Sequence, residues 1–583
     1  VGHNSKAHAI AYMPLVLSGI ILTFRQRYIV GFLLTAVAMA LEISTNHFQM
    51  TYYLMLLVLV LGIAYLIDAF KKKMLPHFFK SVGLLLIAVI LSIGLNATNI
   101  MATQEYVAES TRGQSELTIN PEGSPKQVTT GLDKDYITEY SYGILETFNL
   151  FIPRFLGGGS YEDVGKDSAT YNAFIALGAS PIQALQEAKQ TPTYWGDQTI
   201  VEAPAYIGAV VLFLFIFALF LVRGRLKWWL VGGAILSLLL SYGKNFGILT
   251  DFFIDYIPLY NKFRAVSSIQ VILELCIPVM AIFGLVRLFN EFETEEQKQR
   301  ALKFSLAVCG GLALIFLLFK SSLFDFVGVN DGIYRDNYGQ VFIDAVKEDR
   351  RSLFTQDALR TLILIVLAAG AIYLFLKKKV SETWIVIIFG LLILFDLVGV
   401  DRRYVNNDNF VPSIQVNKPY QANEADLEIM NDKAHFRVFD VVSREPGKAS
   451  YFHNSLSGYH AAKLGRYNEL FDFHIAKNNI NVLNMLNTKY IIADDDKGAI
   501  FPYENTDANG NAWFVSEVAK LNSANDELLA LDSLDTKLKA VTTQSIPNKN
   551  YTIDSTATID ILIYKPNYLK YQSNNTNDGF AVF

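Results

Sequence analysis

Hydrophobic residues gather in long runs over roughly the first 400 residues of the chain. A helix needs about 20 mostly apolar residues to cross a bilayer core of roughly 30 Å. Six runs meet or approach this length: 48–70, 205–222, 265–289, 301–319, 359–376 and 383–400. Four shorter runs are further candidates: 9–24, 28–41, 82–95 and 228–242. The pattern predicts a multi-pass α-helical membrane protein with about ten transmembrane helices.

Lysine and arginine clusters give an independent test of these runs, since a short apolar run could also be a buried helix of a soluble core. Loops on the cytoplasmic side of a membrane are enriched in Lys and Arg. Five basic clusters occur here, at 25–27, 71–73, 223–227, 298–300 and 377–379. When the ten runs are numbered in chain order, each basic cluster follows an odd-numbered run. All five clusters therefore face the same side of the membrane only if all ten runs span it. We therefore predict ten spans, with these clusters in the cytoplasm.

The remaining segments then face the other side of the membrane. We predict a transmembrane bundle over residues 1–400, with a large extracytoplasmic loop at 96–204. Residues 401–583 have an ordinary soluble composition, and we expect an extracytoplasmic α/β domain there. Strand-like runs occur at 436–442, 490–493, 512–518 and 558–564, and helical patterns occur at 425–432 and 469–486.

The composition narrows the class of protein further. Apolar residues make up 52% of the chain and charged residues 18%, a balance that excludes intrinsic disorder. Two cysteines exclude a disulfide framework and a four-cysteine zinc site. A net charge of −5 argues against a nucleic-acid partner, which would require a basic face.

Polar residues inside a predicted span are the first functional candidates. Gln270 and Glu274 lie within the run 265–289, and with Ser267 they share one helical stripe. A charged side chain at the bilayer centre costs about 2.5–3.5 kcal/mol on insertion scales, so such residues usually have a function. The stripe either lines a cavity or holds a neutral Glu274 that bonds a neighbouring helix.

Two cations lie just before that span, on the side where cations should be scarce. Lys262 and Arg264 end a segment at the expected outer interface. Arginine binds phosphate through two parallel hydrogen bonds and lysine acts as a point charge, so both would suit a lipid phosphate. The alternative is that both side chains simply extend to the interface.

Two histidine-bearing segments also face outward, and the order of the first three spans places them near each other. They offer His3, Asn4, Lys6, His8, Glu42, Asn46 and His47. A carboxylate with histidines could bind a divalent metal ion or perform acid–base chemistry. Their spacing matches no fixed metal motif, and interfacial histidines are often structural hydrogen-bonding groups.

The predicted outer loop contains one more candidate segment. Tyr194, Trp195 and Asp197 lie close to the next span. An aromatic ring can stack on a sugar and a carboxylate can bind its hydroxyls, so these residues are candidates for sugar or acceptor binding. Aromatic residues also anchor helices at membrane interfaces, which is the alternative interpretation.

Several ordered blocks resemble the bacterial YfhO family of membrane proteins. The blocks are GHNSKAHAI from Gly2, EISTNHFQMTYY from Glu42, IPRFLGGG from Ile152, YWGDQ from Tyr194, IPLYNKFRAVSS from Ile257 and GYHAAKLGRYNELFD from Gly458. That family is similar to GT-C glycosyltransferases, which are multi-spanning enzymes with an active site on the outer face. The resemblance implies sugar transfer from a polyprenyl-phosphate donor to a cell-envelope glycan or glycolipid acceptor, as in lipoteichoic acid glycosylation, in the bacterial cytoplasmic membrane.

The resemblance also implies functional parts outside this chain. GT-C enzymes carry a catalytic acid in their first outer loop, which would precede Val1, so the resemblance assigns no catalytic residue here. The family also continues past residue 583. Two other classes stay open: a transporter or flippase of a lipid-linked intermediate, and a non-catalytic scaffold. The first loops, the Asp197 loop and Arg264 within one cavity would favour the enzyme, and their placement on separate sides of the bundle would favour the scaffold.

Overall fold

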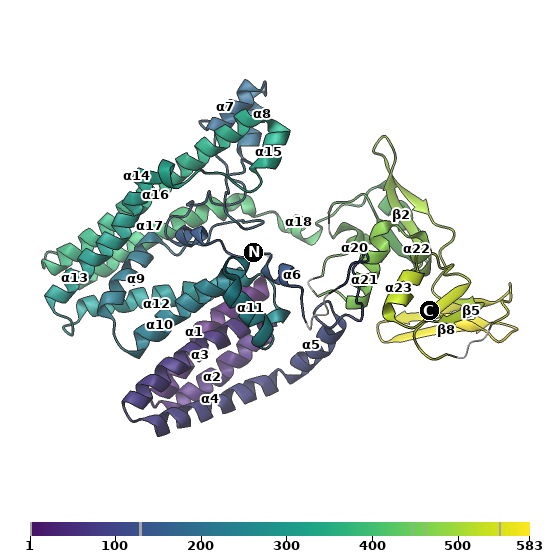
Figure 1. Cartoon of the computed structure of the whole chain (residues 1–583), viewed down its shortest axis with the longest axis horizontal. Coiled ribbons are helices and arrows are strands. Elements are labelled where there is room, and N and C mark those ends of the chain that lie inside the picture. The colour runs from purple at the N-terminus through teal and green to yellow at the C-terminus, as the bar shows by residue number, and fades with distance from the viewer. Residues whose placement is uncertain (1–2, 127–130, 446, 461, 547–549) are drawn as a thin grey trace. The chain divides into compact units, whose positions relative to one another are not determined.

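The computed structural model describes residues 3–126, 131–445, 447–460, 462–546 and 550–583. The chain divides into two compact units, shown in Figure 1. The helical unit comprises Val1–Ile100 and Asp133–Phe410, and the mixed unit comprises Met101–Leu132 and Val411–Phe583. Part of the predicted loop 96–204 therefore belongs with the C-terminal residues, and the boundary falls at 410 rather than 400.

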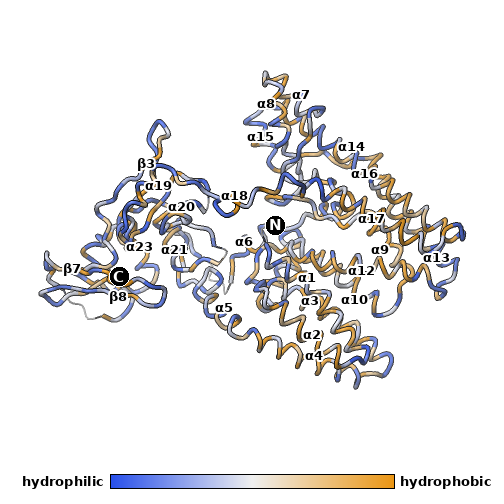
Figure 2. The backbone as a smooth tube through the Cα atoms, turned by 180° about the vertical axis from the view of Figure 1, so that it is seen from behind, coloured by the Kyte–Doolittle hydropathy of each residue, from blue (hydrophilic) through white to orange (hydrophobic). Residues whose placement is uncertain are grey.

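The helical unit is built from long apolar helices, which Figure 2 shows as orange segments. Within the described part of the chain, seven helices are long and apolar enough to cross a membrane: Asn4–Phe24 (α1), Phe48–Lys71 (α3), Leu75–Leu95 (α4), Val266–Phe289 (η4 and α12), Glu295–Leu323 (α13 to α14), Gln340–Leu376 (α16) and Glu382–Asn409 (α17 to η6). This architecture confirms a multi-pass helical membrane protein.

The other predicted runs lie on helices that differ from a simple span. α2 (Tyr28–Ser44) and α9 (Ala209–Leu221) are apolar but have only 17 and 13 residues. α10 (Arg225–Ser241) meets Gly243–Tyr256, which contains α11 (Gly247–Tyr256), at 111°, and the pair counts as an eighth span if it crosses as one broken element. The number ten stays a prediction.

Small residues allow α1 and α2 to pack closely. A Cβ atom on Gly19 would lie 2.4 Å from the Thr35 hydroxyl, and one on Gly31 would lie 2.3 Å from the Thr23 hydroxyl. Each threonine hydroxyl donates to a carbonyl one turn back in its own helix, Thr23 to Gly19 at 3.0 Å and Thr35 to Gly31 at 2.8 Å. Such small residues permit close backbone approach between helices in lipid.

The five basic clusters gather at one end of the helical unit, which we call the basic end. Contacts between the helix termini that carry them place them together: Arg225–Asp68 at 2.8 Å, Arg223–Glu293 at 3.3 Å, and the ring pairs Phe24–Tyr65 at 4.6 Å and Phe289–Phe375 at 5.5 Å. The opposite end, which we call the loop end, carries residues 133–208 and 243–269.

Short helices cover the loop end. They are α6 (Lys134–Thr138), η1 (Leu145–Leu150), α7 (Ala169–Ala176), α8 (Pro181–Ala188), α11, η3 (Tyr260–Lys262) and α15 (Asp331–Tyr338). α16 has 37 residues and, at 1.5 Å per residue, is about 56 Å long. It is therefore much longer than a bilayer core, and its N-terminal half packs against α7 and α15.

The mixed unit combines short helices with four small sheets. β1 (Arg437–Asp440) pairs in parallel with β2 (Thr488–Asp494), which pairs antiparallel with β3 (Ile500–Glu504). Three further pairs are β4 (Trp513–Val515) with β9 (Phe580–Val582), β5 (Glu517–Lys520) with β6 (Lys539–Thr542), and β7 (Thr558–Lys565) with β8 (Tyr568–Asn574). The helices are α18 (Ser413–Asn417), α19 (Glu424–Ile429), α20 (Lys448–Phe452), α21 (Gly465–Phe473), α22 (Ile480–Met485) and α23 (Ala524–Ala530).

The strand predictions for this unit are confirmed, and one helix prediction is wrong. Each of the four strand-like runs overlaps at least one observed strand. The predicted helix 469–486 is broken, because α21 ends at Phe473 and α22 begins at Ile480. Asn478 between them has a left-handed backbone with φ of 56°, which a continuous right-handed helix does not allow.

Candidate functional site

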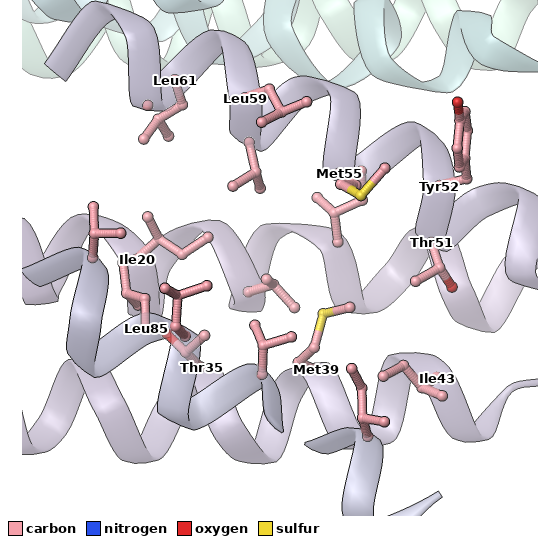
Figure 3. Close-up of a pocket in the computed structure, with 18 of the residues that line it drawn as sticks. Ile20, Thr35, Met39, Ile43, Thr51, Tyr52, Met55, Leu59, Leu61 and Leu85 are labelled. Carbon is pink, nitrogen blue, oxygen red and sulfur yellow. The ribbon is translucent and has the colours of Figure 1, made fainter. Parts of the chain in front are cut away.

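An apolar groove runs along α1, α2, α3 and α4. It has a volume of about 760 Å³ and is shown in Figure 3. Its lining includes Ile20 of α1, Met39 of α2, Leu59 of α3 and Leu85 of α4. The groove begins near the basic end and reaches Phe263 at the loop end. Its size and lining suit an apolar chain.

The segment at the loop end of this groove carries the two predicted cations and has a strained backbone. Leu259 and Ala265 have left-handed φ values of 67° and 57°, which cost a non-glycine residue about 1–2 kcal/mol each. Contacts with α3 hold the segment in place. The Tyr52 hydroxyl donates to the Pro258 carbonyl at 3.0 Å, and the Gln49 amide donates to the Arg264 carbonyl at 2.7 Å.

Arg264 lies against aromatic rings beside a carboxylate. Its guanidinium is 4.5 Å from the centre of the Tyr136 ring and 5.4 Å from that of Tyr140, so both rings stabilise the cation. It pairs with Glu139 at 3.4 Å and donates to the Tyr136 hydroxyl. Burial lowers the pKa of Lys262. Lys262 and Arg264 thus flank Phe263, which is the residue between them that lines the groove.

A fully buried acid, Glu146, lies on the loop end in η1. Its carboxylate accepts the Gly143 N–H at 2.7 Å, the Gln198 amide at 3.0 Å and the Tyr194 hydroxyl. The pKa of Glu146 is raised to about 7, mainly by burial and to a lesser extent by the charge of Asp197, while the hydrogen bonds from Gly143 and Gln198 offset part of the effect. Glu146 therefore changes its protonation state near neutral pH.

Asp197 lies beside Glu146 and is exposed. Two glycines make this approach sterically feasible. A Cβ atom on Gly143 would lie 2.7 Å from an Asp197 carboxylate oxygen, and one on Gly196 would lie 2.5 Å from a Glu146 oxygen. A buried carboxyl group with a raised pKa beside an exposed one is an arrangement that enzymes use for acid–base chemistry.

The backbone next to Tyr194 is held by a buried arginine of α16. Arg350 is 1% exposed and forms two hydrogen bonds to Asp331, at 2.7 and 2.8 Å. It also donates to the carbonyls of Pro192 at 2.8 Å and Thr193 at 3.1 Å. Arg350 thus fixes the strand-like segment that presents Tyr194 to Glu146.

The predicted stripe of α12 lies near the start of α1. The Lys6 ammonium donates to the Ser268 hydroxyl at 3.0 Å and lies within electrostatic range of Glu274, whose side chain is exposed. Gln270 is buried next to the Tyr142 hydroxyl. Tyr142 in turn donates to the Glu146 carbonyl at 2.6 Å. The stripe is therefore connected to the Glu146 site.

The histidine-bearing segments lie at the same end but form no metal centre. His3, Asn4 and His8 are exposed at the start of α1, and His47 directly precedes α3. No group of three or more His, Cys, Asp or Glu side chains that could hold a metal ion occurs among the described residues.

Local hydrogen bonds account for two other residues of these segments. Glu42 is buried, and its two carboxylate oxygens accept the Thr51 hydroxyl at 3.0 and 2.9 Å. The exposed Asn46 accepts from the Asn99 amide at 3.2 Å. The first bond joins α2 to α3, and the second joins the turn after α2 to the segment after α4. The positions of Glu42 and Asn46 are thus explained without a ligand.

Trp195 is only 8% exposed, and its ring packs 5.1 Å from that of Phe326 and 5.9 Å from that of Phe324. This aromatic packing explains its position without a ligand, so sugar stacking on Trp195 stays a prediction that the packing does not favour. Tyr194 has its hydroxyl on Glu146, and Asp197 is the accessible member of the segment.

Sequence reasoning missed three parts of this site. Glu146 is the one acid in the mostly apolar stretch 143–152, and that isolation is a signal that identifies it as a candidate. The rings around Arg264 and the Arg350–Asp331 pair connect residues far apart in the chain, which periodicity does not reveal. The fold and this site define a multi-pass membrane protein with a polar site at one end of its helices. No known protein family, curated protein or solved structure matches the chain.

Proposed function

We propose that the chain belongs to an integral-membrane glycosyltransferase of the GT-C type. It moves a sugar from a polyprenyl-phosphate donor to a cell-envelope glycan or glycolipid acceptor. The proposal includes ten spans, a bacterial cytoplasmic membrane, a cytoplasmic basic end and an extracytoplasmic loop end. The resemblance of the sequence blocks to YfhO proteins and the position of the basic clusters support it.

The observation that carries the proposal is an apolar groove with two cations beside a residue that lines it. A polyprenyl phosphate is a long apolar chain with a phosphate at one end. The groove of about 760 Å³ along α1 to α4 has room for part of such a chain. Phe263 lines the groove and lies between Lys262 and Arg264 in the sequence, so the proposal assigns the donor phosphate to this segment.

The second support is the connection between these cations and the carboxylates. The Thr199 hydroxyl donates to the Glu139 carbonyl at 3.5 Å, and Glu139 pairs with Arg264. Thr199 lies two residues after Asp197. One short chain of contacts thus joins the cation that would hold the donor to the segment that carries the exposed acid.

The chemistry follows from these roles. The acceptor hydroxyl loses its proton to a carboxylate, and its oxygen bonds the anomeric carbon as the bond from that carbon to the phosphate oxygen breaks. The electron pair leaves with polyprenyl phosphate, whose added charge Lys262 and Arg264 stabilise. We assign this proton to Asp197, an exposed acid that has Glu146 and Tyr194 behind it.

Transfer of a labelled sugar from a polyprenyl-phosphate donor in proteoliposomes tests these roles. We expect Arg264→Ala and Asp197→Asn each to lower the rate about 100-fold or more, since each removes a group that acts in the transition state. Glu202→Gln is the matched control, because Glu202 is an exposed acid on the same segment. Normal turnover by Arg264→Ala would contradict the assignment of Arg264 to the donor phosphate. Normal turnover by Asp197→Asn would show that another acid accepts the proton.

A second candidate is a flippase of a lipid-linked intermediate. The contacts among Lys6, Ser268 and Glu274 favour it, because they place polar groups between α1 and α12 inside apolar helices. A flippase would move the intact donor between leaflets and leave its sugar–phosphate bond unbroken. The same proteoliposomes distinguish the two activities by whether labelled sugar is released from lipid.

A further inference from the structure

α11 follows α10 at a sharp bend and is too short to carry the chain across a bilayer. α10 has 17 residues and is about 26 Å long, which is close to the roughly 30 Å of a bilayer core. The segment Gly243–Tyr256 then turns away from α10 by 111°. α11, the main part of that segment, has 10 residues and is about 15 Å long, so at this angle the segment covers less than about 10 Å in the direction of α10. Any crossing by this pair is therefore made by α10, and α11 lies across its end.

Contacts within the loop end hold one side of α11 against the helical unit. Thr250 and Phe253 are the buried residues of the helix. The Thr250 hydroxyl donates to the Gly243 carbonyl at 2.8 Å, and the Phe253 ring packs 5.2 Å from that of Tyr260. These contacts determine which sides of α11 are left open.

A different side of α11 carries a stripe of large apolar residues. Ile248, Phe252 and Tyr256 follow one another at intervals of four residues, so they share one face of the helix. Their exposed fractions are 86%, 50% and 73%. Leu259, which follows α11 and lines the apolar groove, is also exposed and continues this surface. A contiguous exposed apolar surface marks a place where a protein contacts a membrane or another protein.

Two acids lie along one edge of this stripe. Asp251 and Asp255 directly precede Phe252 and Tyr256 in the sequence, which places both acids about 100° around the helix on the same side. Asp251 pairs with Lys134 of α6 at 2.7 Å, and Asp255 is exposed. α11 therefore has a buried side, an apolar side and an acidic edge. Helices that lie in the plane of a membrane interface have an apolar face in the lipid and charged groups in water.

We propose that α11 is an interfacial helix whose apolar stripe lies in the lipid bilayer at the loop end of the helical unit. Lipid is the partner because the apolar helix α10 leads directly into α11, and because Leu259 joins the stripe to the apolar groove. Aromatic side chains such as that of Tyr256 are enriched at this level of a membrane. The inference does not depend on sugar transfer.

Spin labels on single introduced cysteines test this position in the full chain, reconstituted in phosphatidylcholine vesicles. Phe252→Cys and Tyr256→Cys place a label on the stripe, and Asp255→Cys places one on the acidic edge of the same helix. Leu394→Cys is the reference for the bilayer centre, because Leu394 is an exposed residue in the middle of α17. Cys276 and Cys309 are buried, so the unsubstituted chain is the blank. Oxygen concentrates in lipid and a nickel chelate in water, so the ratio of their collision rates with a label measures its depth.

We expect both stripe labels to lie about 5–10 Å into the lipid, the Leu394 label at about 15 Å, and the Asp255 label in water. Stripe labels as deep as the Leu394 label would show that α11 enters the bilayer core as part of a broken span. Stripe labels as accessible to the nickel chelate as the Asp255 label would place the stripe in water. Stripe labels shielded from both reagents would show that protein covers the stripe. Each of these three results would overturn the proposal.

Discussion

Glu146 is the residue whose environment most changes its chemistry. It is fully buried, yet three hydrogen-bond donors and the neighbouring Asp197 surround it. Its pKa is raised from 4.5 to about 7, mainly by burial. A carboxyl group with a pKa of about 7 can hold or release a proton near neutral pH.

The raised pKa of Glu146 predicts how stability depends on pH. Between pH 4.5 and about 7 the folded protein holds a proton on Glu146 that the unfolded chain releases. Stability therefore falls as the pH rises through this window, by roughly 3 kcal/mol in total, and is unaffected by this group above it. Glu146→Gln cannot titrate, so the thermal midpoint of this variant in detergent should depend less on pH.

Glu202→Gln provides the comparison for that experiment, since Glu202 is an exposed acid of the same segment. Its midpoint should follow the wild-type protein from about pH 5 to about pH 8. A Glu146→Gln profile as steep as that of the wild-type protein would show that Glu146 is not the titrating group.

Single residues were predictable only where their chemistry conflicts with the local pattern. Lys262 and Arg264 are cations where few are expected, and they flank Phe263, which lines the groove. Glu42 was also a candidate for metal binding or acid–base chemistry, but its hydrogen bonds to Thr51 explain its position without a ligand. Trp195 lies among phenylalanines from distant segments, and such packing cannot be inferred from spacing along the chain.

At the scale of elements, α16 connects the apolar bundle to the loop end. Its C-terminal half is one of the apolar runs, while its N-terminal half carries Arg350, which binds Asp331 and the backbone at 192–193. One continuous helix therefore positions the Tyr194 segment relative to the bundle.

Removing Arg350 should destabilise this connection. Arg350→Met leaves Asp331, which is 6% exposed, as a buried charge without its partner, and such a loss costs about 3–5 kcal/mol. Arg351→Met is the neighbouring control, because Arg351 is exposed and only lies 5.5 Å from the Phe326 ring, so it should cost less than about 1 kcal/mol. Equal thermal midpoints for the two variants would refute the role of Arg350.

Apolar runs predicted where helices form but not how each crosses a membrane. Each of the ten runs overlaps a helix, because a mostly apolar stretch is stable in lipid when its backbone groups bond one another within a helix, although residues 205–208 precede α9. α2 and α9, with 17 and 13 residues, are shorter than the roughly 20 residues that a span usually needs. The pattern of apolar residues also does not predict the bend of 111° after α10. In the mixed unit, alternation predicted the strands, whereas the break at Asn478 depends on one backbone angle.

At the scale of the whole molecule, the structure separates a helical unit from a mixed unit, and the candidate site belongs to the helical unit. The helical unit has the groove, the cations and the carboxylates at its loop end. The apolar stripe of α11, which we assign to the lipid, belongs to the same unit.

The central claim is sugar transfer to the cell envelope, and mass spectrometry of envelope glycans tests it most directly. Glycans are compared between cells with the gene, cells without it, and cells that carry Asp197→Asn or Glu202→Gln. We predict that a sugar modification disappears without the gene and with Asp197→Asn, and persists with Glu202→Gln. An envelope glycan profile that is identical with and without the gene would contradict the proposed activity.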